Sequence, residues 1–221
     1  MVFFSGRNLA CFLRWRGTWT EGNKLYIEKA YIGKRSLVVD LQLTIKLLAS
    51  ASVTKPLFIV GTDHKYQHRS CELTELQHED FERYIGGIVL EKKIALLAEE
   101  NNEQFVQENG LAQSTIQKLA KIHSVEHLFC ELDRKSRAEN GMEQESGIQI
   151  SGLLNGHSKE EIARNIQESY RNREAYWLKC ILEKDVWPVL FICGANHAIP
   201  FQELVSRNDA LPLLLSGDWS N

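Results

Sequence analysis

Five short, nearly uninterrupted apolar runs alternate with longer polar stretches, and this alternation limits the possible folds more than any other feature of the chain. The runs have the length of β-strands and lie at residues 57–60, 94–98, 127–131, 189–193 and 211–215. Apolar residues at every position, rather than at every second one, are typical of strands covered on both faces in a parallel sheet. Segments of helical length lie between the runs, at residues 76–90, 113–123 and 159–183. The sequence therefore predicts an α/β fold with a central, mostly parallel or mixed sheet flanked by helices.

The length of the chain, 221 residues, is enough for one sizeable hydrophobic core. We therefore expect one domain overall, in which residues 1–55 form an N-terminal segment that packs on an α/β core at residues 56–221. Residues 134–157 are the least regular part of this core, because four glycines interrupt them. We expect a long loop there, either a lid over a site or a mobile segment.

The segment at residues 159–183 carries the clearest helix signals. Ser158 and Glu161 have the spacing of a capping box, in which each side chain bonds the backbone of the other residue. Apolar residues then recur with the period of one helix face, and Arg173 falls within that stripe. A charged guanidinium on a core-facing stripe requires an anion or a set of carbonyls to meet it. Arg173 is therefore either a site residue or half of a buried ion pair.

Charge and composition exclude several classes of partner. The formal net charge of −3 gives no reason to expect nucleic acid or an anionic membrane surface as a partner. The apolar stretch at residues 37–53 is interrupted by Asp40 and Lys46, so it does not predict a membrane-spanning helix. The five cysteines are odd in number, are widely spaced and include no C-x-x-C pair. This pattern suits reduced thiols, and we expect a cytoplasmic protein.

One local arrangement occurs twice, at residues 61–64 (GTDH) and 194–197 (GANH). Each segment follows an apolar run, begins with a glycine and ends with a histidine. Because ligands bind at the carboxyl ends of the strands in open α/β sheets, His64 and His197 are expected to meet in one site. The residues expected to contact the substrate there are Asp63, Asn196, Gly61 and Gly194.

Acidic residues follow two other runs. Glu99 and Glu100 come directly after the second run, and Glu131 ends the third. Two neutral imidazoles and a carboxylate can hold manganese, cobalt or iron, and the ligands would then be His64, His197 and Glu99. The alternative for the acid pair is a role at a helix N-terminus, where negative charge is favoured. Glu131 is expected to support the site or to pair with an arginine.

The paired motifs, with the acid pair between them and Arg173 before the second motif, resemble the TraB/PrgY/Tiki family. That family belongs to a wider group with the erythromycin esterases and the ChaN-like haem-binding proteins. The resemblance covers roughly residues 56–205 and implies a fold of the EreA/ChaN-like type. It also implies that His64 and His197 are the paired histidines, that Glu99 or Glu100 is the catalytic or metal-binding acid, and that Arg173 is the site arginine.

These observations together predict a hydrolase that acts on a small-molecule or peptide substrate. The catalytic residues are expected to be His64, His197, Glu99, Glu100 and Arg173. In a metal-dependent version a divalent ion activates water, as implied by the Tiki-type proteases; in a metal-free version a histidine is the general base. Two alternatives remain, namely a protein that binds haem or a small molecule without turnover, and an interaction module with a degenerate site. The sequence leaves the oligomeric state open.

Overall fold

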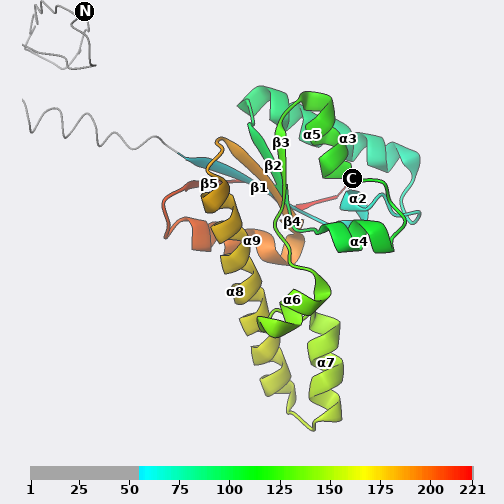
Figure 1. Cartoon of the computed structure of the whole chain (residues 1–221), viewed down its shortest axis with the longest axis vertical. Coiled ribbons are helices and arrows are strands. Elements are labelled where there is room, and N and C mark those ends of the chain that lie inside the picture. The colour runs from blue at the N-terminus through cyan, green and yellow to red at the C-terminus, as the bar shows by residue number, and fades with distance from the viewer. Residues whose placement is uncertain (1–54, 221) are drawn as a thin grey trace, which may run out of the picture. The chain divides into compact units, whose positions relative to one another are not determined.

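A computed structural model describes residues 55–220, which belong to one compact unit. Five strands form a single sheet in the order β3-β2-β4-β1-β5, and every neighbouring pair is parallel (Figure 1). The predicted α/β fold is thereby confirmed, with a sheet that is parallel throughout. The strands are β1 Pro56–Thr62, β2 Leu96–Glu99, β3 Glu126–Phe129, β4 Val189–Gly194 and β5 Leu211–Trp219.

The apolar character of the central strands comes from two separate cores, one on each face of the sheet. Leu57 and Ile59 of β1 point into a cluster that also contains residues of α8 (Lys159–Lys184) and α9 (Ala195–Val205). Phe58 and Val60 point into a second cluster with residues of α3 (Glu75–Lys92) and α5 (Thr115–His123). Because successive side chains of a strand alternate between faces, burial of both faces requires the apolar runs found in the sequence.

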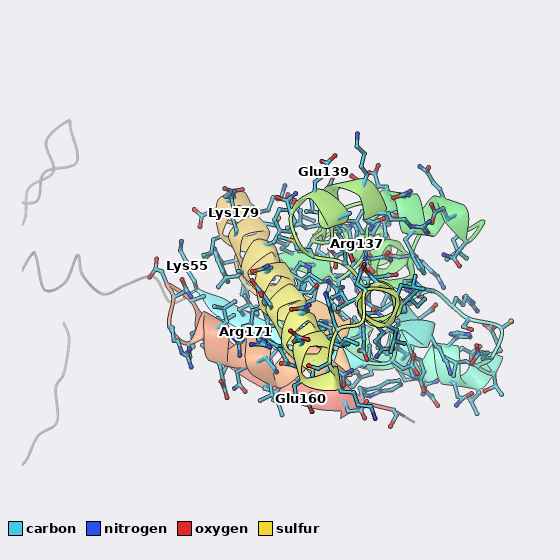
Figure 2. The ribbon with its side chains drawn as sticks, turned by 90° about the horizontal axis from the view of Figure 1, so that it is seen from below. Lys55, Arg137, Glu139, Glu160, Arg171 and Lys179 are labelled. Atoms are coloured by element: carbon cyan, nitrogen blue, oxygen red, sulfur yellow. The ribbon has the colours of Figure 1, made fainter. Side chains whose placement is uncertain are left out.

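The predicted helices correspond to α3, α5 and α8. The capping box of α8 is present, since Ser158 Oγ accepts from Glu161 N and Glu161 Oε2 accepts from Ser158 N. Charged residues of α8 such as Glu160, Arg171 and Lys179 lie on the exposed side of this helix (Figure 2). The remaining helices are α2 His64–Gln67, α4 Glu103–Glu108, α6 Arg134–Glu139 and α7 Glu145–Leu154.

The prediction of a long loop at residues 134–157 is wrong, because this segment forms α6 and α7 (Figure 1). α7 packs against α8, and the two helices extend together beyond the sheet. Gly152 shows why the glycine content of this segment wrongly indicated a loop. A Cβ at this position would lie 2.5 Å from Ile162 Cγ1 of α8. The glycine therefore permits close helix packing instead of marking a loop.

The expectation that residues 1–55 pack on the core falls outside the described residues, except for Lys55, as does the apolar stretch at residues 37–53. Among the helices between residues 55 and 220, none has both the length and the apolar character that a transmembrane span requires.

Candidate active site

Two neighbouring strands bring the paired histidines to one edge of the sheet. β1 ends at Thr62, and Asp63 caps α2 with its side chain, so His64 is the first residue of that helix. β4 ends at Gly194, which is the N-cap of α9, and His197 lies in the first turn of α9. Because Thr62 and Gly194 pair in the parallel β1–β4 register, both motifs leave the sheet at its carboxyl edge.

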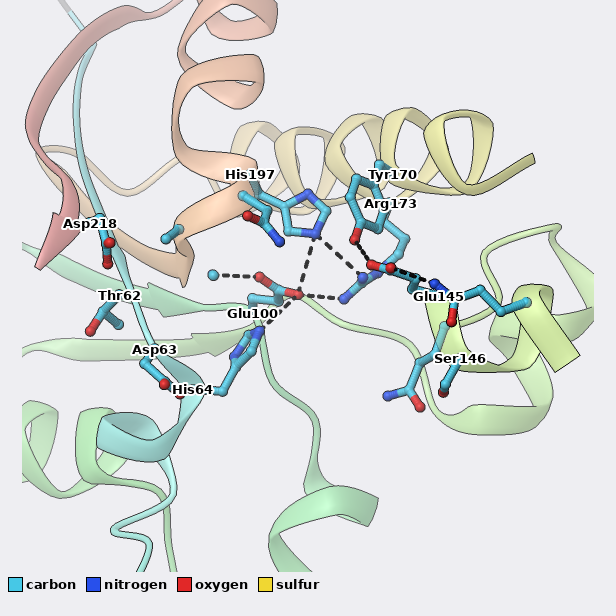
Figure 3. A pocket seen from close by; sticks show the side chains of 15 residues that line it. Thr62, Asp63, His64, Glu100, Glu145, Ser146, Tyr170, Arg173, His197 and Asp218 are labelled. Atoms are coloured by element: carbon cyan, nitrogen blue, oxygen red, sulfur yellow. Dashed lines mark hydrogen bonds and ion pairs between the residues drawn. The ribbon is translucent and has the colours of Figure 1, made fainter. Parts of the chain in front are cut away.

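A cavity of about 640 Å³ lies at this edge (Figure 3). His64, Glu100, Arg173 and His197 all line it, although they come from α2, the end of β2, α8 and α9. The structure thus brings together the two motifs, one of the two acids and the arginine of the helical stripe. Other lining residues include Thr62, Asp63, Glu145, Tyr170, Asn196 and Asp218.

Glu100 is the centre of the cluster. Its Oε1 atom lies 2.5 Å from Arg173 Nη2, 3.6 Å from His64 Nε2 and 3.9 Å from His197 Nε2 (Figure 3). Its Oε2 atom accepts a hydrogen bond of 2.8 Å from the backbone N–H of Gly194. The carboxylate is 3% exposed, so its charge is stabilised by these neighbours instead of by solvent.

A second carboxylate completes the surroundings of Arg173. Its Nε donates to Glu131 Oε2 at 2.7 Å, so one guanidinium joins Glu100 to Glu131. Burial by itself raises the pKa of Glu100, but the attraction of His64 in its protonated form and of Arg173 outweighs burial and holds this pKa below its usual range. Glu100 is therefore ionised at neutral pH. Arg173 forms the buried ion pair that the sequence left as an alternative, and it does so inside the candidate site.

The tautomer of His64 follows from its bond to Gln67. Gln67 Nε2 donates to the carbonyl of Ile192 at 3.4 Å, so its Oε1 atom is the group that faces His64 Nδ1 at 2.7 Å. An amide oxygen only accepts, and His64 Nδ1 must carry the proton. The neutral ring therefore presents an unprotonated Nε2 to the cavity, and the His64 side chain is 45% exposed.

His197 is held more rigidly. Its Nδ1 lies 2.8 Å from Glu174 Oε1, and its Nε2 faces Arg173 Nη1 at 3.5 Å. Because the arginine is always a donor, Nε2 accepts and the ring donates from Nδ1 to the carboxylate. Tyr170 and Trp177 pack against the imidazole with ring centroids 4.4 and 4.9 Å away. The side chain of His197 is only 5% exposed, so its ring has little freedom to move.

α7 forms one wall of the cavity. The Tyr170 hydroxyl of α8 donates to Glu145 Oε2 of α7 at 2.6 Å (Figure 3). Burial and the bond to this carboxylate raise the pKa of Tyr170 to about 12, so the hydroxyl stays protonated as a donor. The contact joins the two helices next to His197.

Glu99 is not brought to the cavity. Its side chain is fully buried and accepts from Ser114 Oγ, and its Oε1 lies 2.8 Å from His127 Nε2. Glu99 is the last residue of β2 and Glu100 follows it, so their side chains leave the backbone in opposite directions. The structure places Glu100 in the site, and Glu99 ties α5 to the sheet through its N-cap, Ser114.

The metal ligands expected from the sequence do not form one set here. Glu99 points away from His64 and His197, and a guanidinium already lies against the Glu100 oxygen that faces both rings. Among residues 55–220, no group of three or more histidine, cysteine or acidic side chains is arranged to hold a metal ion. The arrangement around Glu100 therefore does not fit a divalent cation.

The four residues expected to contact substrate have different positions. Asp63, Asn196 and Gly194 line the cavity. Gly61 does not line it, because it is buried within the sheet, where a Cβ would lie 2.2 Å from Gly217 O of β5. Its role is to let two strands approach closely.

Sequence reasoning missed Gln67 and Glu174, the residues that orient the two imidazoles. Glu174 could have been found from the sequence, because it lies four residues after Tyr170 and three before Trp177 and therefore on the core-facing side of α8. Gln67 lies three residues after His64 in a one-turn helix whose existence the sequence did not reveal.

The assembled site offers a free imidazole nitrogen beside a buried ion pair. Such a nitrogen can accept a proton, and the adjacent carboxylate can stabilise the resulting positive charge. Comparison of the chain with protein-family models, with curated proteins and with solved structures gives no match.

Proposed function

We propose that the protein is a hydrolase in which His64 activates water in the cavity at the carboxyl edge of the sheet. The single observation that carries this proposal is the convergence of His64 Nε2, Arg173 Nη2 and His197 Nε2 on one oxygen of Glu100. The order of these residues also resembles that of the TraB/PrgY/Tiki family, whose esterase relatives use histidine and glutamate to activate water.

In the proposed reaction, His64 Nε2 removes a proton from water while the water oxygen attacks a carbonyl carbon. The imidazolium that forms faces Glu100 Oε1 at 3.6 Å, and the carboxylate stabilises it. The proton then passes to the leaving group as the C–O or C–N bond breaks, which yields a carboxylic acid and an alcohol or amine. Arg173 keeps Glu100 ionised, and His197, held by Glu174, fixes the guanidinium from the other side.

The first turn of α9 is the group suited to stabilise the oxyanion of the tetrahedral intermediate. Gly194 gives this helix no side-chain cap, and Ala195 and Asn196 line the cavity next to it. Backbone N–H groups at a helix N-terminus favour negative charge. The arrangement resembles an oxyanion hole without requiring Arg173, whose nitrogens already face Glu100, Glu131 and His197.

A cavity of about 640 Å³ suits a small molecule or the end of a peptide as substrate. We place the enzyme in the cytoplasm, because the four cysteines between residues 55 and 220 are free thiols, as expected in a reducing compartment.

Hydrolysis of a panel of nitrophenyl esters and short peptides tests the proposal. We expect His64→Ala to lower kcat/KM by about 10²- to 10⁴-fold, because the general base is lost. The control is His157→Ala, which replaces an exposed histidine that does not line the cavity and should leave the rate unchanged. Equal rates for wild type and His64→Ala would contradict the proposed base.

The same assay separates the other hypotheses. A rate that falls with a chelator and returns with manganese, cobalt or iron would favour the metal-dependent version. A chain that binds haem or a small molecule but cleaves no member of the panel would favour the binding protein. The metal-free version predicts a rate of hydrolysis that neither a chelator nor added metal changes.

A further inference from the structure

Arg137 is a buried cation that the proposed reaction does not use. It belongs to α6, where it is 9% exposed, and it faces the interior while Glu139 of the same helix faces solvent (Figure 2). Within residues 55–220 its guanidinium has no hydrogen-bond or ion-pair partner. Its nitrogens are not among the fully enclosed unpaired polar atoms of this part of the protein, so the donors open onto the space beside them. A largely buried cation without a protein partner still calls for an explanation.

The guanidinium lines a small side cavity of about 90 Å³ next to the main one. The two cavities share His64, Glu100, Gln144 and Arg173 as lining residues, so they adjoin each other. Phe105 gives the side cavity an apolar wall. Its volume admits a group of a few atoms and not a whole substrate.

The acids near Arg137 are already engaged elsewhere. Glu131 Oε2 accepts from Arg173 Nε, and Glu131 Oε1 accepts from the N–H of Leu132 at 2.9 Å. Glu100 accepts from Arg173 and Gly194. Burial lowers the pKa of Arg137, and the attraction of Glu131 does not offset it. The donors of Arg137 are therefore unmatched within the described part of the protein.

We propose that Arg137 binds a carboxylate group of the substrate in this side cavity. A guanidinium presents parallel N–H donors whose spacing matches the two oxygens of a carboxylate, and burial strengthens such a pair. This inference rests on the proposed hydrolase, because the bound group is taken to belong to its substrate. That substrate would carry a free carboxylate on one side of the bond that is hydrolysed. The subsite itself depends only on Arg137 and its cavity.

Carboxylate binding can be measured without turnover, with acetate as the probe. We expect acetate to shift the amide NMR resonances of residues that line the side cavity, Asn101, Asn102 and Phe105, while acetamide at the same concentration does not. Arg137→Gln should weaken acetate binding at least about tenfold, because a charge-assisted pair is replaced by a neutral contact. The matched control is Arg134→Gln, which removes an exposed arginine from the same helix and should bind acetate as the wild type does.

Thermal unfolding without acetate tests the competing structural role. Under the proposal, Arg137→Gln unfolds at the same temperature as the wild type or higher, because the substitution breaks no hydrogen bond or ion pair within the described part of the protein. Acetate binding by Arg137→Gln with wild-type affinity, or unfolding of that variant at a clearly lower temperature, would overturn the assignment. A second variant, Arg137→Lys, keeps the positive charge but lacks the parallel N–H donors of the guanidinium, and it should bind acetate more weakly than the wild type. If the protein binds acetate through Arg137 but hydrolyses no member of the panel, the proposed hydrolase is wrong and the carboxylate-binding subsite stands.

Discussion

Each of the two cavity histidines is held in one tautomer by a different kind of neighbour. Gln67 is a neutral acceptor for His64, whereas Glu174 is a carboxylate acceptor for His197. The neutral partner leaves His64 Nε2 unprotonated and partly exposed, as a base requires. The charged partner and the two aromatic rings make His197 a rigid part of the wall.

A third histidine, His68, is adapted to remain neutral. Burial, followed by the proximity of His64, lowers the pKa of His68 to about 4. Its ring packs on Phe105 with a centroid distance of 4.2 Å. The neutral ring therefore adds no charge to the side cavity in which Arg137 lies.

This lowered pKa predicts a loss of stability in acid. Below pH 6.5 the unfolded chain protonates His68 while the folded chain does not until about pH 4, so unfolding is favoured increasingly as the pH falls through this window. The contribution is at most about 3 kcal/mol, and partial exposure reduces it. His68→Phe keeps the aromatic contact and should lose less stability between pH 7 and pH 4.5 in urea unfolding than the wild type does.

His157→Phe is the control for that experiment, because His157 is exposed. It should follow the wild-type pH dependence. If His68→Phe also follows the wild type, the ring of His68 is not kept neutral by burial.

Among the elements, the contact between β1, β5 and α9 depends on one missing side chain. A Cβ on Gly61 would lie 2.2 Å from the carbonyl oxygen of Gly217 and 2.8 Å from Ala198 Cβ. These atoms belong to the backbone of β5 and to the buried face of α9, so neither can move away freely. Gly61 therefore sets how closely these elements pack, and α9 carries His197.

We expect Gly61→Ala to lower the free energy of unfolding by about 1–3 kcal/mol, because the new methyl group overpacks this contact. Gly87→Ala is the matched control. Gly87 lies exposed within α3, where a Cβ meets no atom within 4 Å among the described residues, so alanine there should raise the free energy of unfolding by about 1 kcal/mol. Denaturant titration of both variants measures the two changes, and equal stability of Gly61→Ala and wild type would contradict the close approach.

The strands and the long helices could be predicted from local sequence, because their signals are local. Apolar runs marked all five strands, and the capping box marked α8. α7 and α9 were missed for a physical reason: glycine in α7 serves contact with Ile162, and the first turn of α9 has the GANH composition of a strand exit. Both helices depend on their packing partners instead of on their own propensities.

At the scale of the whole molecule, the site is assembled from segments that no local pattern connects. The repeated motif was enough to place His64 and His197 at one edge. It did not decide between Glu99 and Glu100, because the direction of a side chain at the end of a strand depends on the register of the sheet. The carboxylate of Glu174 and the unmatched guanidinium of Arg137 are likewise products of tertiary packing.

The central claim is that residues from four separate elements act as one catalytic unit. A double-mutant cycle tests it most directly: kcat/KM is measured for the wild type, His64→Ala, His197→Ala and the double variant on the best ester or peptide of the panel. When two residues act as one unit, the first substitution already removes most of the rate, and the second lowers kcat/KM little further. The account predicts that the double variant is about as slow as the slower single variant. Losses that simply multiply would mean that the two histidines act independently, and would contradict a single site around Glu100.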